Sequence, residues 1–176
     1  MKKVIVKAKL ASREKFEQKL TDIDLDFSPI YWQHDRIYVP RGYKTGMNLP
    51  RLTMRTEMRS VDKPAKYSLI LRRHIEDSGV DVIAETLVKD YTEAIRIILQ
   101  LGFKQEAEVS KRRQEIQMGE GTALYLDKVE GQNGYFVKLE SAMMDGDTVG
   151  EVRDDLTKTL AVLGESNLVN QPYFEI

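Results

Sequence analysis

The sequence predicts an α+β fold dominated by one mostly antiparallel sheet, in a single domain spanning residues 1–176. About eight segments alternate apolar and polar residues with a period of two, which is typical of strands with one buried face. Three other segments carry apolar residues at helical spacing behind a capping residue. At 176 residues, with 41% hydrophobic and 31% charged residues, the chain is long enough for one core and has the composition of a folded protein.

The first half of the chain contains five predicted strands and one helix. After the first strand, Ser12 can cap a short helix that runs to about Leu20. A loop rich in turn residues, "RGYKTGMNLP", follows the second strand, and a turn around "DSGV" predicts a hairpin between the fourth and fifth strands. The five strands are predicted within residues 3–10, 28–40, 51–60, 66–75 and 77–88.

The second half contains two predicted helices and three strands. Asp90 and Glu93 form a capping-box pattern before a helix that Gly102 ends, and Thr148 and Glu151 repeat the pattern before the last helix. Between the helices, strands are predicted at residues 104–118, 122–130 and 134–141, with "GQNG" as a strong hairpin turn.

Composition excludes several classes of protein. The net charge of −1 gives no global basic excess, so we expect no nucleic-acid partner. The absence of cysteine excludes disulfides, thiolate catalysis and cysteine-based zinc sites. No apolar run approaches the roughly 18–20 residues of a membrane span, so we predict a cytoplasmic protein without a membrane partner.

Charged residues line one face of several predicted strands. Alternation of this kind is usually a solvated face of a flat sheet. If the sheet closes, the same residues converge on one lumen of mainly basic charge, which needs a polyanion because unpaired buried cations are costly. Triphosphate suits the planar fork of arginine and the point charge of lysine. Periodicity alone is consistent with both the flat sheet and the closed sheet. The residues concerned are Lys3, Lys7, Lys9, Arg51, Arg55, Glu57, Arg72, Glu85, Lys111, Arg113, Asp127, Lys138 and Glu140.

Seven motifs in order resemble the CYTH family of triphosphate tunnel proteins, which includes class IV adenylyl cyclases, thiamine triphosphatases and inorganic triphosphatases. "VKAKL" is similar to the end of the family's opening E-x-E-x-K signature, and "QHDRIY" to its Q-x-D-x-Y-F segment. The other five are "TMRTE", "SLILRR", "AETLV", "LGFKQEAEVSKRRQEI" and "YLDKVEGQNGYFVKLES". Each motif is weak alone, but the order over about 140 residues is fairly specific.

The resemblance implies a closed eight-stranded antiparallel barrel, open at both ends, that holds a triphosphate and one or two Mg²⁺ or Mn²⁺ ions. It implies metal ligands at Glu57, Glu85, Asp127 and Glu140, and catalytic roles for Lys7, Asp127 and Glu140. It also implies a possible homodimer. The phosphate-binding residues that it implies are Lys3, Lys7, Lys9, Arg51, Arg55, Arg72, Lys111, Arg113 and Lys138.

The chain departs from the family pattern where metal-binding carboxylates are usual. Lys3 and Ile5 stand at the two signature glutamates, and Lys138 replaces the first acid of the terminal E-x-E. Each lysine removes an oxygen ligand and adds a cation. Two functions therefore remain. One is a cyclase or triphosphatase with a weakly held ion, and the other is a non-catalytic nucleotide or polyphosphate binder whose lysines replace the metal's charge.

Overall fold

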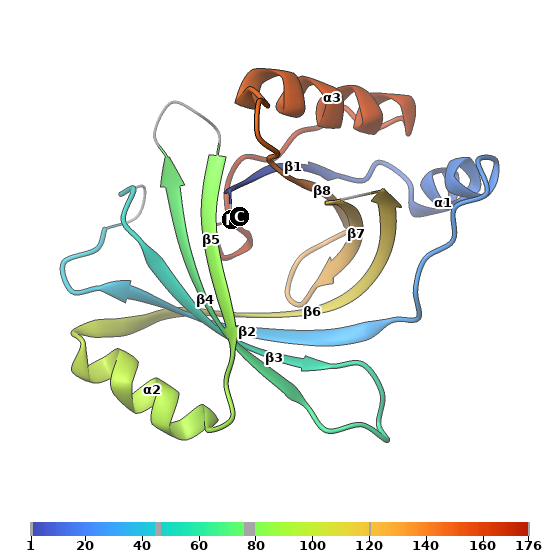
Figure 1. The fold of residues 1–176 in the computed structure, drawn as a ribbon. Helices are drawn as coiled ribbons and strands as arrows, with labels where there is room; N and C mark the ends of the chain where they lie inside the picture. Colours follow the sequence, from blue (N-terminus) through green and yellow to red (C-terminus); the bar gives the residue numbers. More distant parts are fainter. Residues whose placement is uncertain (1, 45–46, 76–79, 120, 176) are drawn as a thin grey trace.

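A computed structural model of the chain describes residues 2–44, 47–75, 80–119 and 121–175, and in them eight antiparallel strands form a closed barrel (Figure 1). This confirms the predicted fold class. Around the barrel the order is β1-β5-β4-β3-β2-β6-β7-β8. The strands are β1 (Lys2–Lys9), β2 (Tyr31–Pro40), β3 (Arg51–Met58), β4 (Lys66–Ile75), β5 (Val80–Leu87), β6 (Phe103–Gly119), β7 (Thr122–Val129) and β8 (Phe136–Ala142). The predicted turn around "DSGV" and part of the predicted loop at 41–50 lie outside the described residues.

Apolar side chains point outward from the barrel and are covered by three helices. These are α1 (Arg13–Thr21), α2 (Tyr91–Gln100) and α3 (Val149–Val162). Phe16 of α1 and Leu160 of α3 are buried in one cluster with the apolar faces of β1, β7 and β8. Ile98 of α2 is buried on the other side, against β2 and β3. Since the main core lies outside the barrel, the lumen has room for charged side chains beside a smaller apolar cluster.

The predicted helix caps are confirmed, because each accepts a hydrogen bond from a backbone amide of the first turn. Ser12, Asp90 and Thr148 accept from the third residue after each of them. The barrel covers only some of the apolar residues in and directly after the second helix. Leu99 and Leu101 are exposed, and Ile98 is the buried residue of α2.

Strand register turns the charged faces inward. Residues directly opposite each other in an antiparallel pair lie on the same face. Arg55 on β3 lies opposite Asp35 on β2, and Lys7 on β1 lies opposite Lys138 on β8. Because the sheet closes, these charged faces line one lumen. Periodicity left open whether the sheet is flat or closed, and the structure shows the closed barrel.

The C-terminal segment lies at one end of the barrel and lines the cavity there, and the expected opening at both ends stays a prediction. β1 pairs with β5 only through Lys2–Val4, and further along β1 the backbone bonds instead to residues 167–169. The Lys9 amide donates to the Asn167 carbonyl at 3.1 Å, and the Val169 amide to the Lys7 carbonyl at 2.7 Å. The chain then enters a single 3₁₀ turn, η1 (Tyr173–Glu175), within the ring of strands (Figure 1).

In the described residues, no helix combines the length and the apolar composition needed to cross a membrane.

Candidate functional site

The lumen contains a cavity of about 600 Å³ that is strongly basic. Eight cationic side chains and three carboxylates line it. The carboxylates are Asp35, Asp81 and Glu175, and the cations are Lys7, Arg51, Arg55, Arg72, Lys111, Arg113, Lys138 and Arg153. Such a space attracts anions because low-dielectric walls concentrate the field of the cations inside it.

Seven of the nine residues predicted to bind phosphate line this cavity. The two exceptions are Lys3 and Lys9. Lys3 forms an ion pair with Glu140 at 2.7 Å, outside the cavity lining. Lys9 is exposed at the end of β1, because the strand there has passed beyond the cavity. The structure therefore does not support a phosphate contact for Lys9.

Arg113 of β6 and Asp127 of β7 form a buried bidentate ion pair. Both N···O distances are 2.6 Å, and Asp127 also accepts a hydrogen bond from the Tyr173 hydroxyl at 2.7 Å. Burial alone would raise the pKa of Asp127, but the Arg113 guanidinium outweighs it and the pKa falls to about 2. Asp127 is thus a carboxylate whose two oxygens are both occupied.

Asp35 of β2 is held in the same way by two cations. It accepts two hydrogen bonds from Arg55, at 2.7 and 2.9 Å, and one from Lys111 at 2.9 Å. Burial opposes ionisation, yet the two cations lower the pKa of Asp35 well below its usual range.

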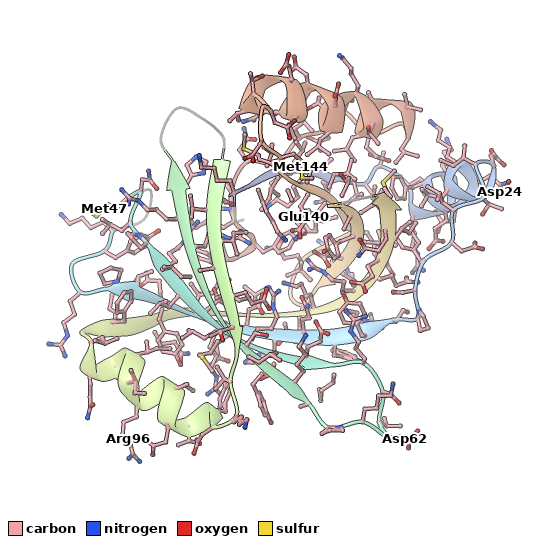
Figure 2. All side chains as sticks on the ribbon, in the orientation of Figure 1. Asp24, Met47, Asp62, Arg96, Glu140 and Met144 are labelled. Atoms are coloured by element: carbon pink, nitrogen blue, oxygen red, sulfur yellow. The ribbon has the colours of Figure 1, made fainter. Side chains whose placement is uncertain are left out.

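Glu140 of β8 lies between two lysines. Lys3 donates to one oxygen at 2.7 Å and Lys138 to the other at 2.8 Å, and the Tyr125 hydroxyl adds a bond at 3.2 Å. Figure 2 shows Glu140 within the ring of strands. Burial lowers the pKa of Lys138 to about 7, although Glu140 acts in the opposite direction. We call these three groupings, which centre on Asp127, Asp35 and Glu140, the paired set.

Four further cations line the cavity without a close carboxylate: Arg153 of α3 and three cations of the barrel strands. We call the three strand cations the open set: Lys7, Arg51 and Arg72. In the part of the chain that the structure describes, neither Lys7 nor Arg51 forms an ion pair. Arg72 has a loose one, with 3.7 Å between its Nη1 and Asp81 Oδ2. Burial, together with the nearby Arg72 guanidinium, lowers the pKa of Lys7 to about 8.

The C-terminal segment contacts two members of the open set, Lys7 and Arg51. Lys7 donates a hydrogen bond to the Gln171 carbonyl and lies 4.3 Å from the centroid of the Tyr173 ring. Arg51 lies 5.5 Å from the centroid of the Phe174 ring. Aromatic faces and a carbonyl attract cations but carry no full charge. The excess positive charge of the cavity is therefore not neutralised.

The carboxylates predicted as metal ligands do not gather into a metal site. Asp127 and Glu140 are occupied by Arg113, Lys3 and Lys138. Glu57 accepts from Gln33 at 2.7 Å and from Arg59 at 2.6 Å, and Glu85 is exposed on β5. Among the described residues, no three acids or histidines lie close enough to share an ion. A divalent cation would have to displace bound ammonium or guanidinium groups, so the residues present do not fit a resident metal.

No family model matches the sequence, and no characterised protein matches it in sequence. Solved structures do match. A protein of Pyrococcus horikoshii has a TM-score of 0.83 at 21% identity, covering 98% of this chain and 96% of its own. A putative adenylate cyclase of Vibrio parahaemolyticus has a TM-score of 0.81 at 15% identity, covering 98% and 95%. A putative adenylyl cyclase of Hippeastrum, described as having a dominant triphosphatase activity, has a TM-score of 0.63 at 16% identity, covering 99% and 94%. The chain shares the fold of these proteins.

Sequence reasoning missed several residues of the cavity. Tyr173 and Phe174 lie in a tail whose only sequence signal is a short, partly apolar composition after the last helix. Arg153 lies on α3, where a charge reads as an ordinary solvated position. His74 of β4 also lines the cavity and bonds to Asp81 at 3.0 Å.

Proposed function

We propose that the cavity binds the triphosphate group of a nucleotide or of inorganic triphosphate through side-chain cations, without a resident metal ion. One observation carries the proposal: Lys7, Arg51 and Arg72 converge on a basic cavity and lack close carboxylate partners. Buried cations without partners reduce stability, so a fold that keeps them has a use for an anion. The fold shared with putative cyclases supports the same ligand class.

Direct pairing of phosphate with Arg and Lys can replace what a metal would supply for binding. Charge-assisted hydrogen bonds to phosphate are short and roughly twice as strong as neutral ones. Lys3 and Lys138 hold Glu140, the carboxylate that would otherwise remain for a metal. The non-catalytic alternative raised by the sequence is therefore the function that the geometry supports best.

The proposal concerns binding and does not extend to catalysis. The predicted roles of Lys7, Asp127 and Glu140 in turnover stay predictions, as do the homodimer and the cytoplasmic location. Asp127 and Glu140 are each held by cations on both oxygens, so neither is placed to accept a proton from water or from a hydroxyl group.

Titration calorimetry with inorganic triphosphate and with ATP tests the proposal, first in EDTA and then with excess Mn²⁺. We expect one-to-one binding in EDTA and no product in the cell afterwards. Binding that requires Mn²⁺ and is followed by cyclic AMP or free phosphate would replace this proposal with the enzymatic one. The absence of binding under both conditions would overturn both.

Arg72→Gln and Arg73→Gln form a matched pair of variants for the same titration. The two residues are neighbours on β4, but Arg72 faces the cavity and Arg73 is exposed on the outer face. We expect Arg72→Gln to weaken triphosphate binding by about 10- to 100-fold, in line with the ~1.5–3 kcal/mol of a hydrogen bond to a charged group. Arg73→Gln should leave affinity unchanged. Equal losses would indicate nonspecific attraction to a basic surface.

A further inference from the structure

The three lysines that line the cavity differ in whether a carboxylate holds their charge. Lys111 forms an ion pair with Asp35 at 2.9 Å. Lys138 forms one with Glu140 at 2.8 Å. A lysine held in this way cannot become neutral without leaving a buried carboxylate unpaired, which is unfavourable. Lys7 has no carboxylate partner among the described residues, so it is the cavity lysine that can lose its charge most easily.

The surroundings of Lys7 favour its neutral form. Burial, together with the Arg72 guanidinium, lowers the pKa of Lys7 to about 8, whereas an ordinary lysine has a pKa of about 10.4. Asp127 acts in the opposite direction, but Arg113 already occupies both of its oxygens. At pH 8 about half of the Lys7 side chains are therefore neutral amines with a free electron pair. The charged and titratable groups that face Lys7 are Arg72 of β4, Lys111 of β6, Asp127 of β7, Lys138 of β8 and Tyr173 of η1.

The cavity has room for a small group on Lys7 and an excess of positive charge around it. Its volume is about 600 Å³. Arg72 has only a loose contact with Asp81, at 3.7 Å, and so lacks a close anion. A group that places negative charge on Lys7 is therefore stabilised by a guanidinium through charge-assisted hydrogen bonds. An aldehyde or a ketone would form an imine, which lacks that charge.

Carbon dioxide is a reagent that meets both requirements. It is small and uncharged, and it reacts with neutral amines but not with ammonium groups. The nitrogen electron pair forms a bond to carbon, one C=O electron pair moves onto oxygen, and the nitrogen releases a proton to the solvent. The product is a carbamate, which carries one negative charge and keeps one N–H. On Lys7 that N–H can still donate to the Gln171 carbonyl, which accepts from Lys7 in the structure.

We propose that Lys7 reacts reversibly with carbon dioxide to form a carbamate, which pairs with Arg72 and competes with phosphate for the cavity. The reaction exchanges a cation of the open set for an anion, so carbon dioxide should weaken triphosphate binding. By the reciprocity of linked equilibria, bound triphosphate should suppress the carbamate. Carbamate formation is independent of the proposed function, whereas its effect on affinity rests on that function.

Nuclear magnetic resonance of the protein without substitutions tests for the carbamate directly. Protein labelled with ¹⁵N at lysine is held at pH 8 in ¹³C-labelled bicarbonate, which equilibrates with carbon dioxide. We expect a carbamate carbon signal split by one-bond coupling to ¹⁵N, because the splitting requires a bond between a lysine nitrogen and the added carbon. Labelling lysine alone excludes the α-amino group, which forms carbamates as well. The absence of a coupled signal would overturn the proposal.

Three variants assign the signal to one lysine. Lys7→Met and Lys7→Arg should remove it, since a guanidinium stays protonated and forms no carbamate. Lys9→Met is the matched control and should keep it, because Lys9 follows on the same face of β1 but is exposed. A coupled signal that survives Lys7→Met belongs to another lysine and contradicts the proposal. Alkylation of the carbamate followed by peptide mass spectrometry locates it without any substitution, so the assignment does not depend on the folding of a variant.

Titration with inorganic triphosphate in EDTA at pH 8, with and without bicarbonate at equal ionic strength, tests the regulation. We expect bicarbonate to weaken binding by about threefold or more, and saturating triphosphate to reduce the carbamate signal correspondingly. The affinity of Lys7→Arg, whatever its value, should not depend on bicarbonate. An equal loss in Lys7→Arg would show that bicarbonate competes as an anion and would refute the regulatory role. Triphosphate that does not bind even without bicarbonate contradicts the proposed function instead, and the carbamate signal then still decides the modification.

Discussion

The paired set and the open set both direct arginine and lysine side chains into one lumen, but they differ in what neutralises these cations. Arg113 has two carboxylate contacts of 2.6 Å, whereas Arg51 has an aromatic face at 5.5 Å. The first arrangement satisfies a buried cation within the protein, and the second does not. A lumen rich in arginine and lysine is therefore partly scaffold and partly site. Ion pairing with carboxylates distinguishes the structural cations from those available to a ligand, and amino-acid composition does not.

The largest expected effect comes from breaking a pair. Arg113→Met leaves Asp127 as a buried carboxylate without its cation, so we expect the free energy of unfolding to fall by about 3–5 kcal/mol. Urea denaturation measures it. The double variant with Asp127→Asn should recover most of the loss, because it removes the stranded charge. A loss below about 1 kcal/mol for the single variant would contradict the division into two sets.

Removing a cation of the open set should weaken triphosphate binding without lowering the free energy of unfolding. Lys7→Met keeps the length of the side chain but removes a charge that burial disfavours. We expect triphosphate affinity to fall by about 10- to 100-fold, while the free energy of unfolding stays the same or rises. Lys9→Met is the matched control, because Lys9 follows on the same face of β1 but is exposed. Loss of stability in Lys7→Met would show that Lys7 belongs to the scaffold.

The pKa of Lys7, about 8, predicts how binding depends on pH. Above pH 8 the free protein loses the proton that phosphate requires, so affinity should fall about tenfold between pH 7 and pH 9. At pH 8, binding should take up protons, which calorimetry detects as a dependence of heat on the buffer. The groups that face Lys7 are Arg72 of β4, Lys111 of β6, Asp127 of β7, Lys138 of β8 and Tyr173 of η1.

Triphosphate affinity is expected to fall as the pH rises. The Lys7 contribution to the free energy of unfolding of the ligand-free protein should instead rise with pH over part of that range. The folded pKa of Lys7 lies below its value in the unfolded chain, so between about pH 8 and pH 10 the unfolded state binds more protons. The contribution of Lys7 to the free energy of unfolding therefore rises with pH in this window. Thermal melts of the unmodified protein and of Lys7→Met at both pH values measure the difference. An unchanged pH dependence in Lys7→Met would assign the effect to other groups.

The smallest effect tests the contact between the C-terminal segment and the paired set. Tyr173→Phe removes one hydrogen bond to Asp127 and keeps the ring, and Arg113 still holds both carboxylate oxygens. We expect a loss of about 1 kcal/mol in the free energy of unfolding, measured by urea denaturation. An unchanged free energy of unfolding in Tyr173→Phe would show that this hydrogen bond does not stabilise the fold.

The sequence by itself determined the strands, the helix caps and which charges share one face of each strand. Alternation is local, so the period of two in "RLTMRTEM" places Arg51 and Arg55 on one face without any knowledge of the fold. Capping is local too, which explains why Ser12, Asp90 and Thr148 were identified. The resemblance supplied the closure of the sheet, which periodicity left open.

Only the tertiary structure decided which charges pair and where the tail goes. Asp35 and Lys111 are 76 residues apart, and Asp127 and Tyr173 are 46 apart, so no local pattern links them. The carboxylates expected to hold a metal are instead neutralised by cations from neighbouring strands. The tail enters the lumen because β1 runs beyond β5 and leaves backbone groups that residues 167–169 satisfy. Backbone N–H and C=O groups left unpaired at a barrel seam are unfavourable, so they bond to another segment. Which segment this is depends on the tertiary structure.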